Sequence, residues 1–582
     1  MKILAALLIG ALAATPAGAA DSPQIEVEEL QLENGMRWLL FERHESPTLY
    51  LGWVAHVGSV DERPGITGMS HLFEHMMFKG TRTIGTRDIE RDLALIADQE
   101  ALREEMRAEE SRLRERLRRG EVDDVSAPER HSEGYRELKA RFDELIEQQR
   151  ETMIKNQLDE IYTRNGGEGL NAGTTEDLTV YFVQLPSNRL ELWCWLESDR
   201  LLNPVFREFY SERDVVYEER RLRTESTPLG KHDEAFNAMF WEAMPYSWPV
   251  VGWPSDIAAI TKEQADAYYD LFYAPQNLTG VLVGDFDTAE ARRLIEAYFG
   301  RIPRGERPPP EMVTLEPEQK GEKRFLAEAE TSPTLRIWWH GVPHVHRDRA
   351  PLDLLTDVLS GRTGRLYKGL VQGREIVNEI GASIDLKKFA GTIQLEATIK
   401  EGVEPALVEA AIDEELERLR TEPVGELELQ KVKNQAKANA YRRLSSGFFI
   451  AIQLMFYDGL GDWRYINTRA AELDAVTAED LTRAAETYLK PERRTVGVFL
   501  RAEGAEPEDP ELAGLPPQAQ AMARQALGQV ESADDPARLQ QMVSELEGAL
   551  AGVPPEMRPA LELVLKRARA RLAALEGSGE EE

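Results

Sequence analysis

The chain repeats its own sequence pattern once, and this internal repeat constrains the fold more than any other feature. Ser46–Leu49 reads Ser-Pro-Thr-Leu before a strand-like run, and Ser332–Leu335 has the same sequence in the same setting. Near the end of each half, Tyr273–Pro275 and Tyr488–Pro491 each precede another strand-like run. A chain of 582 residues is also too long for one ordinary core. We therefore predict two homologous domains.

Within each half, short strand patterns alternate with long helical patterns. This arrangement favours an α+β fold, in which each domain is a mainly antiparallel sheet covered by helices. We place the domains at 21–303 and 324–504, joined by a proline-rich and charged linker at 304–323. Beyond them, prolines precede amphipathic runs rich in alanine and leucine, which predicts a C-terminal helical appendage at 505–582.

The first half is longer than the second. Pro47 to Pro275 spans 228 residues, whereas Pro333 to Pro491 spans 158, a difference of 70. Between about 97 and 164 the chain is densely charged, with leucines and methionine at steps of seven and four. These residues predict an inserted antiparallel helical hairpin. Its role stays open between a spacer and a gate or docking arm over a site.

The N-terminus predicts export. Met1-Lys2, an apolar run and a small-residue stretch ending at Ala20 match a secretory signal peptide at 1–20. No later run approaches the ~20 apolar residues that a transmembrane helix needs, and the only cysteine is Cys194. We therefore expect a soluble periplasmic protein without an intrachain disulfide. The net charge of −33 argues against nucleic acids and membranes as partners, because both are bound through Lys and Arg facing phosphates.

Two imidazoles and one carboxylate lie within little more than one helical turn in His71–His75, which reads His-Leu-Phe-Glu-His. In a helix, positions i and i+4 project from one face, so His71 and His75 can hold one metal ion. Zinc accepts such ligands, and a catalytic zinc site keeps one position for a water whose pKa falls toward ~7. Glu74 can take that water's proton. The motif therefore predicts a zinc centre with its own base.

The surrounding residues support this interpretation. A glycine-rich loop precedes the motif, and apolar residues occupy most positions within and after it, so the helix is predicted to be buried. Buried His and Glu side chains are costly unless they are paired or bind a metal. A rival cluster of His340, His344 and His346 has no carboxylate at helical spacing, and we interpret it as a turn with exposed imidazoles.

A third zinc ligand must come from elsewhere in the chain. The helical run 211–221 carries Glu212 and Glu219, which are seven residues apart and therefore on one face, while Glu218 points about 100° away. Residue patterns alone leave an alternative, in which these carboxylates are surface charges matched to the neighbouring arginines.

With these motifs in place, the chain resembles the inverzincin metallopeptidases, the family of pitrilysin, insulin-degrading enzyme and mitochondrial processing peptidase. The resemblance implies that Glu219 is the third zinc ligand and that Glu212 supports the site. It also implies that Leu170, Asn171 and Ala172 form an edge strand that pairs with an extended peptide. The predicted hairpin explains why Glu219 lies so far along the chain from His75.

One departure from the family pattern bears on partners. Active members usually receive an Arg and a Tyr from the second half-molecule, whereas the corresponding positions here hold Val371 and Asn378. Arg374 could take the role in a shifted register. We therefore expect a heterodimer in which a related, zinc-free subunit supplies the Arg and Tyr; a homodimer is the alternative.

Together these features predict a zinc-dependent endopeptidase with one Zn²⁺ per chain that cleaves short or unfolded peptides. In this hypothesis zinc-bound water attacks the peptide bond, and Glu74 is the general base. The alternative from another functional class is a non-proteolytic peptide-binding or assembly subunit of a related two-subunit complex.

Overall fold

The computed structural model describes residues 24–578 apart from 126–129, 503–509, 514, 516, 532, 534, 551–552 and 554–556. The predicted signal peptide at 1–20 lies outside the described residues. No helix in these ranges combines the length and apolar character needed to cross a membrane.

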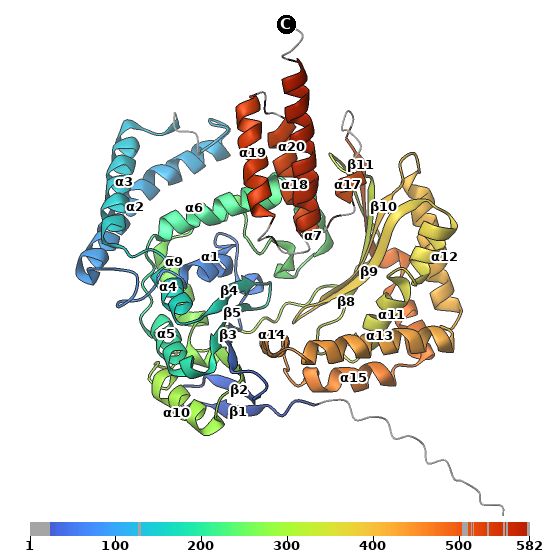
Figure 1. The fold of residues 1–582 in the computed structure, drawn as a ribbon, viewed down its shortest axis with the longest axis horizontal. Coiled ribbons are helices and arrows are strands. Elements are labelled where there is room, and N and C mark those ends of the chain that lie inside the picture. The colour runs from blue at the N-terminus through green and yellow to red at the C-terminus, as the bar shows by residue number, and fades with distance from the viewer. Residues whose placement is uncertain are drawn as a thin grey trace, which may run out of the picture.

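Two sheets form the centre of the molecule (Figure 1). The first has six strands in the order β1-β2-β6-β3-β5-β4, and the second has five in the order β7-β11-β8-β10-β9. Each sheet is antiparallel except for one parallel pair, β2 with β6 and β7 with β11. The strands are β1 (Glu28–Gln31), β2 (Arg37–Glu42), β3 (Thr48–Ala55), β4 (Glu168–Thr174), β5 (Thr179–Pro186), β6 (Leu278–Gly284), β7 (Lys323–Ala329), β8 (Thr334–Gly341), β9 (Val377–Leu386), β10 (Gly391–Ile399) and β11 (Arg494–Arg501).

The matching strand order confirms the prediction of two homologous α+β domains with mainly antiparallel sheets. The two Ser-Pro-Thr-Leu segments lead into the central strands β3 and β8. The repeat extends to helix caps: Thr261 and Thr477 each form a capping box at the start of the helix that precedes the last strand of the domain.

Helices cover the outward side of each sheet (Figure 1). The first domain contains α1 (Met69–Met76), α2 (Ile89–Arg118), α3 (Glu133–Thr152), α4 (Gln157–Arg164), α5 (Leu190–Leu202), α6 (Phe209–Arg220), α7 (Gly230–Phe240), α8 (Pro254–Ile257), α9 (Lys262–Phe272) and α10 (Thr288–Phe299). The second contains α11 (Arg349–Leu359), α12 (Pro405–Thr421), α13 (Glu426–Leu444), α14 (Gly447–Leu460), α15 (Tyr465–Ala475) and α16 (Ala478–Tyr488). The tail contains α17 (Pro510–Ala513), α18 (Pro517–Glu531), α19 (Pro536–Ala549) and α20 (Arg558–Ser578), with an apolar core of its own.

One helix of each domain packs against the sheet of the other domain. Helix α14 packs Leu454 and Met455 onto β3 and β6 of the first sheet, and α7 packs Phe236 onto the second sheet. A glycine allows the close approach in both places. A Cβ on Gly52 would lie 2.8 Å from the Met455 sulfur, and a Cβ on Gly497 would lie 2.8 Å from the Phe236 ring. The packing of α14 and α7 across the two domains joins their apolar cores.

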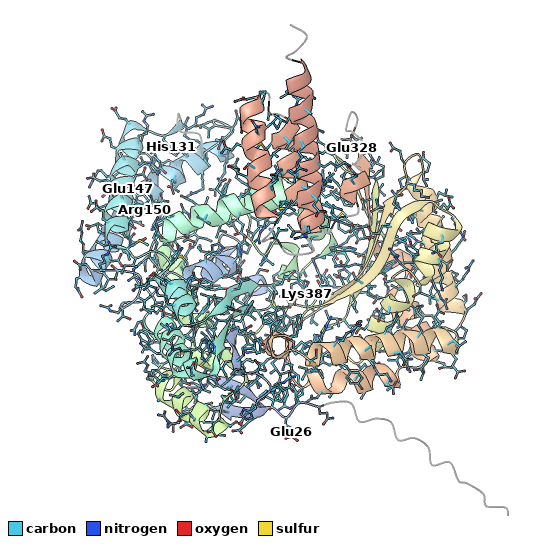
Figure 2. The ribbon with its side chains drawn as sticks, viewed as in Figure 1. Glu26, His131, Glu147, Arg150, Glu328 and Lys387 are labelled. Carbon is cyan, nitrogen blue, oxygen red and sulfur yellow. The ribbon has the colours of Figure 1, made fainter. Side chains whose placement is uncertain are left out.

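The segment 300–322, between α10 and β7, is bound to the first domain by hydrogen bonds. The Glu316 carboxylate accepts hydrogen bonds from the backbone N–H groups of Glu242, Ala243 and Met244 at 2.7–3.1 Å. The loop between β9 and β10 makes a further contact between the domains. There Lys387, labelled in Figure 2, places its ammonium nitrogen 2.7 Å from Glu176 in the turn after β4.

The helical hairpin is present, but its arms differ from the predicted range of 97–164. The first arm, α2, begins at Ile89, because Asp88 caps it by accepting from the N–H of Arg91 at 3.1 Å. The second arm, α3, ends at Thr152. Helix α4 is a separate helix that leads into β4. His131 lies at the outer end of the hairpin, and Glu147 and Arg150 lie nearer its base (Figure 2).

Candidate metal centre

Helix α1 is held in place from its N-terminus by a buried carboxylate. Glu62 accepts hydrogen bonds from the N–H groups of Gly68 at 2.8 Å and Ser70 at 2.7 Å, which meets the need of a helix start for acceptors. Burial raises the pKa of Glu62 to about 8. Gly68 has a φ of +90°, and a Cβ there would lie 2.5 Å from the Val251 carbonyl oxygen. The loop before α1 is therefore closely fitted to its surroundings.

The structure brings His71, His75 and Glu219 together, with one ligand atom from each lying within 4.8 Å of the others. The Glu219 Oε2 atom lies 3.3 Å from His75 Nε2 and 3.7 Å from His71 Nε2. Zinc–ligand bonds of ~2.0–2.2 Å in a tetrahedron place donor atoms about 3.4 Å apart, so these separations fit a zinc ion. Among the described residues this is the one group of three or more such side chains arranged to hold a metal.

The side chains of the candidate metal centre have shifted pKa values, because they are buried and lie close to one another. Burial lowers the pKa of His71. Burial also acts to lower the pKa of His75, but hydrogen bonds to Glu212 and Glu219 outweigh it and raise that pKa to about 9. The hydrogen bond from His75 in turn lowers the pKa of Glu219. A metal ion in this position would take over the interactions that the proton on His75 makes here.

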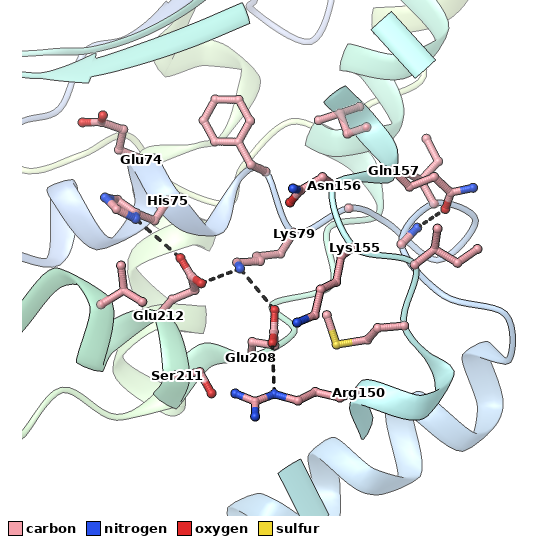
Figure 3. Close-up of a pocket in the computed structure, with 18 residues that line it drawn as sticks. Glu74, His75, Lys79, Arg150, Lys155, Asn156, Gln157, Glu208, Ser211 and Glu212 are labelled. Carbon is pink, nitrogen blue, oxygen red and sulfur yellow. Dashed lines mark hydrogen bonds and ion pairs between the residues drawn. The ribbon is translucent and has the colours of Figure 1, made fainter. Parts of the chain in front are cut away.

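Glu212 lies behind His75 rather than in the group of three. Its Oε2 atom is 3.5 Å from His75 Nδ1, while Oε2 of Glu219 faces Nε2 of the same ring. Lys79 contacts Glu212 from the other side (Figure 3). A carboxylate at Nδ1 orients an imidazole and fixes which nitrogen carries the proton, as is common for histidine ligands. The geometry therefore places Glu219 with His71 and His75 in the candidate metal centre and Glu212 against the opposite ring nitrogen of His75.

The Glu74 carboxylate forms a hydrogen bond to β4. The Thr174 hydroxyl donates to Glu74 Oε2 at 2.6 Å. Sequence reasoning missed Thr174. The available signal is strand alternation, because Thr174 lies on the same face of β4 as Ala172, two residues before it.

Strand β4 lies at the edge of the first sheet, and within the described residues it pairs with β5 alone. Leu170, Asn171 and Ala172 lie on this strand, with Asn171 exposed and opposite Phe182. Strand β4 contacts α1, and among the described residues no strand pairs with its edge that faces away from β5. An extended peptide added to that edge would pass close to Glu74.

The second histidine cluster differs from its prediction as a turn with exposed imidazoles. His340 is half-buried and stacks on Phe240 at 4.1 Å, and the buried His344 stacks on Tyr457 at 5.4 Å. Burial lowers the pKa of both to about 4. These imidazoles are packing groups, because aromatic neighbours from α7 and α14 enclose them.

The positions that depart from the family pattern lie in the second domain. Val371 packs against the core of that domain, and Asn378 is exposed on β9. Arg374 forms an ion pair with Glu414 on α12. Arg374 is the residue that would replace the missing family arginine if the sequence register were shifted, and here its guanidinium is already paired with Glu414.

Two family models match separate parts of this chain. The model of the family "Insulinase (Peptidase family M16)" matches residues 38–100, which include α1, and the model "Peptidase M16 inactive domain" matches residues 259–436. The chain is 27% identical to the zinc protease PqqE of Helicobacter pylori, over 59% of this chain and 79% of that protein. It is 24% identical to the probable zinc protease PqqL of Escherichia coli, over 47% of this chain and 23% of that protein.

Solved structures give the same architecture. A protease from Helicobacter pylori superposes with a TM-score of 0.66 at 21% identity, covering 82% of this chain and all of that one. Pitrilysin superposes with a TM-score of 0.59 at 16% identity, covering 82% of this chain and 45% of that one.

Proposed function

The chain belongs to the M16 peptidase family, and from this premise we propose that it is a zinc-dependent endopeptidase acting on short or unfolded peptides. One observation carries the proposal: the donor atoms of His71, His75 and Glu219 converge within 4.8 Å beside Glu74. Relatives named zinc proteases support the same chemistry. The non-proteolytic alternative is less favoured, because it gives Glu74 no task.

His71, His75 and Glu219 would hold the zinc ion, and Glu212 would orient His75. Zinc in this position supplies a Lewis acid that polarises the scissile carbonyl and makes water more acidic. Glu74 accepts the proton of the attacking water and returns it to the leaving nitrogen. Thr174 holds the Glu74 carboxylate in one orientation throughout.

The substrate would bind as an added strand on the edge of β4. Main-chain hydrogen bonds to Leu170, Asn171 and Ala172 give affinity without demanding a particular sequence. They require an extended peptide, so folded proteins are excluded unless a segment unfolds. This is the physical reason to expect short or unfolded substrates.

We extend the proposal to a partner and a compartment. Val371 and Asn378 leave this chain without the Arg and Tyr of active relatives, so a related zinc-free subunit is proposed to supply them in a heterodimer. A periplasmic location follows from the predicted signal at 1–20, and the Escherichia coli relative PqqL is described as a periplasmic protease.

The decisive experiment digests a peptide library with the wild type and Glu74→Gln, each with its zinc content measured. We expect one zinc per chain in both proteins and cleavage by the wild type alone. Unchanged cleavage by Glu74→Gln would remove Glu74 from the mechanism, and a wild type without zinc would remove the metal centre. Repeating the digestion with a candidate partner tests the heterodimer proposal. Full activity of the chain without a partner would contradict that proposal.

A further inference from the structure

A cavity of about 520 Å³ opens directly beside the candidate metal centre (Figure 3). One wall contains Glu74, His75 and Glu212. The opposite wall contains Arg150 from the end of α3 and Lys155 from the segment that follows it. The base of the inserted hairpin thus forms part of the same cavity as the proposed catalytic residues.

The hairpin wall is fixed to the first domain by backbone contacts. The N–H of Ile154 donates to the Gly85 carbonyl at 3.0 Å, and the N–H of Arg87 donates to the Thr152 carbonyl at 2.9 Å. The N–H of Gly85 donates to the Gln157 side chain at 2.6 Å. Bonds on both sides of Lys155 hold this stretch in place, so the cavity has a defined shape.

The carboxylates that line the cavity already have partners. Glu208 pairs with Lys79 at 3.2 Å and lies 3.8 Å from Arg150, and Glu212 contacts Lys79 and His75. Glu74 accepts from the Thr174 hydroxyl outside the cavity lining.

Lys155 differs from these groups. In the described part of the chain its ammonium makes no hydrogen bond or ion pair, and Figure 3 shows the side chain pointing into the cavity. Arg150 is shared between Glu147 at 2.6 Å and Glu208, which leaves it able to take another acceptor. Among the described basic side chains that line the cavity, Lys155 is therefore the one without an acidic partner.

We propose that this cavity is a substrate subsite that binds a carboxylate next to the cleaved bond, with Lys155 as its specificity-determining residue and Arg150 assisting. The inference rests on the proposed peptidase function and adds the substrate class. Phe78, Ile84, Met153 and Leu158 supply apolar wall for the methylene groups of a glutamate side chain. A basic side chain would meet Lys79, Arg150 and Lys155 and is disfavoured.

A carboxylate at this position has two sources, the side chain of an acidic residue or the C-terminus of a short peptide. Paired peptides with Glu or Gln at each position around the cleaved bond, blocked at both ends, isolate the side-chain source because Glu and Gln have nearly the same shape. The same peptides with free or amidated C-termini isolate the terminal source. Preference in either pair supports the subsite and identifies its ligand.

For the wild type we expect kcat/KM for the carboxylate peptide to exceed that of its neutral partner by about two- to fivefold, because Lys155 is exposed and exposed ion pairs are weak. Lys155→Ala should abolish the preference, and Lys155→Glu should reverse it toward Lys-containing peptides. Rising salt should weaken it. Lys139→Ala is the matched control, because Lys139 is an exposed lysine on the same hairpin that does not line the cavity.

Binding of fluorescent peptides to Glu74→Gln separates this inference from the proposed function. The same ratio of affinities there supports the subsite even when no protein variant cleaves any peptide. Equal affinity within both pairs, Glu against Gln and free against amidated C-terminus, overturns it, and so does a preference that Lys155→Ala leaves intact.

Discussion

The Thr174 hydroxyl donates a 2.6 Å hydrogen bond to the Glu74 carboxylate, tying the proposed base to the strand proposed to bind substrate. Thr174→Val keeps the shape of the side chain and removes the donor. We expect kcat to fall by about five- to thirtyfold through misorientation of Glu74, with KM and zinc content unchanged. Steady-state kinetics with zinc analysis measures this.

Thr174→Ser restores the hydroxyl and is the matched control. It should recover most of the lost kcat, because the donor returns without the methyl group. An equal loss in both variants would mean that packing, rather than the hydrogen bond, is what Thr174 contributes.

Glu219 and Glu212 lie on one helix face but are expected to fail in different ways. Glu219→Ala removes a proposed ligand, so zinc should no longer be retained stoichiometrically after dialysis. Glu212→Gln leaves the three proposed ligands in place but removes the carboxylate charge that faces His75 Nδ1 and Lys79, and we expect zinc affinity or activity to fall by about 10- to 100-fold. Metal titration of both proteins tests this order; tighter zinc binding by Glu219→Ala than by Glu212→Gln would reverse the assignment. Glu218→Ala, on the exposed side of α6, is the control.

The contact between Asp177 and the loop after β9 predicts a pH dependence of stability. Asp177 accepts from the Tyr246 hydroxyl at 2.6 Å and the N–H of Lys388 at 2.9 Å, yet burial raises its pKa to about 6. The folded protein binds the Asp177 proton more tightly than the unfolded chain does. Protonation of Asp177 therefore stabilises the folded state fully below about pH 4, and this contribution is lost as pH rises through 6.

Asp177→Asn cannot titrate, so the stability difference between wild type and variant should change across this window. We expect the wild type to lose up to about 3 kcal/mol relative to Asp177→Asn between pH 4 and pH 7. Unfolding midpoints of both proteins at matched pH values measure the difference. A constant difference across the window would show that Asp177 titrates normally.

The exchanged helices depend on two glycines. A Cβ at Gly52 would lie 2.5 Å from the Tyr181 carbonyl oxygen as well as close to Met455, and a Cβ at Gly497 would meet Phe236. We expect Gly52→Ala and Gly497→Ala each to lower the free energy of unfolding by about 1–3 kcal/mol. Gly381→Ala is the control, since nothing lies within 4 Å of its added Cβ. Thermal unfolding in which all three variants behave alike would contradict tight packing of α7 and α14.

Sequence reasoning succeeded where the signal is local or repeated. The spacing of His71 and His75 specifies a helical face, and the two Ser-Pro-Thr-Leu segments predicted paired domains whose strand orders match. It was less accurate at the hairpin, because the charged residues around Ile89 and Thr152 hide helix ends that depend on a cap and on tertiary contacts. His340 and His344 were misjudged for a related reason, since the rings that bury them come from distant helices.

The sequence by itself determined the helix that carries two imidazoles and a carboxylate, and the duplication of the domain, because both follow from local periodicity and from direct comparison of segments. Only the tertiary structure decided that Glu219 faces His71 and His75 while Glu212 lies behind the ring, that Thr174 holds Glu74, and that Lys155 lies across a cavity from the centre. Such relationships join residues far apart in the chain, and their geometry is set by how sheets and helices pack.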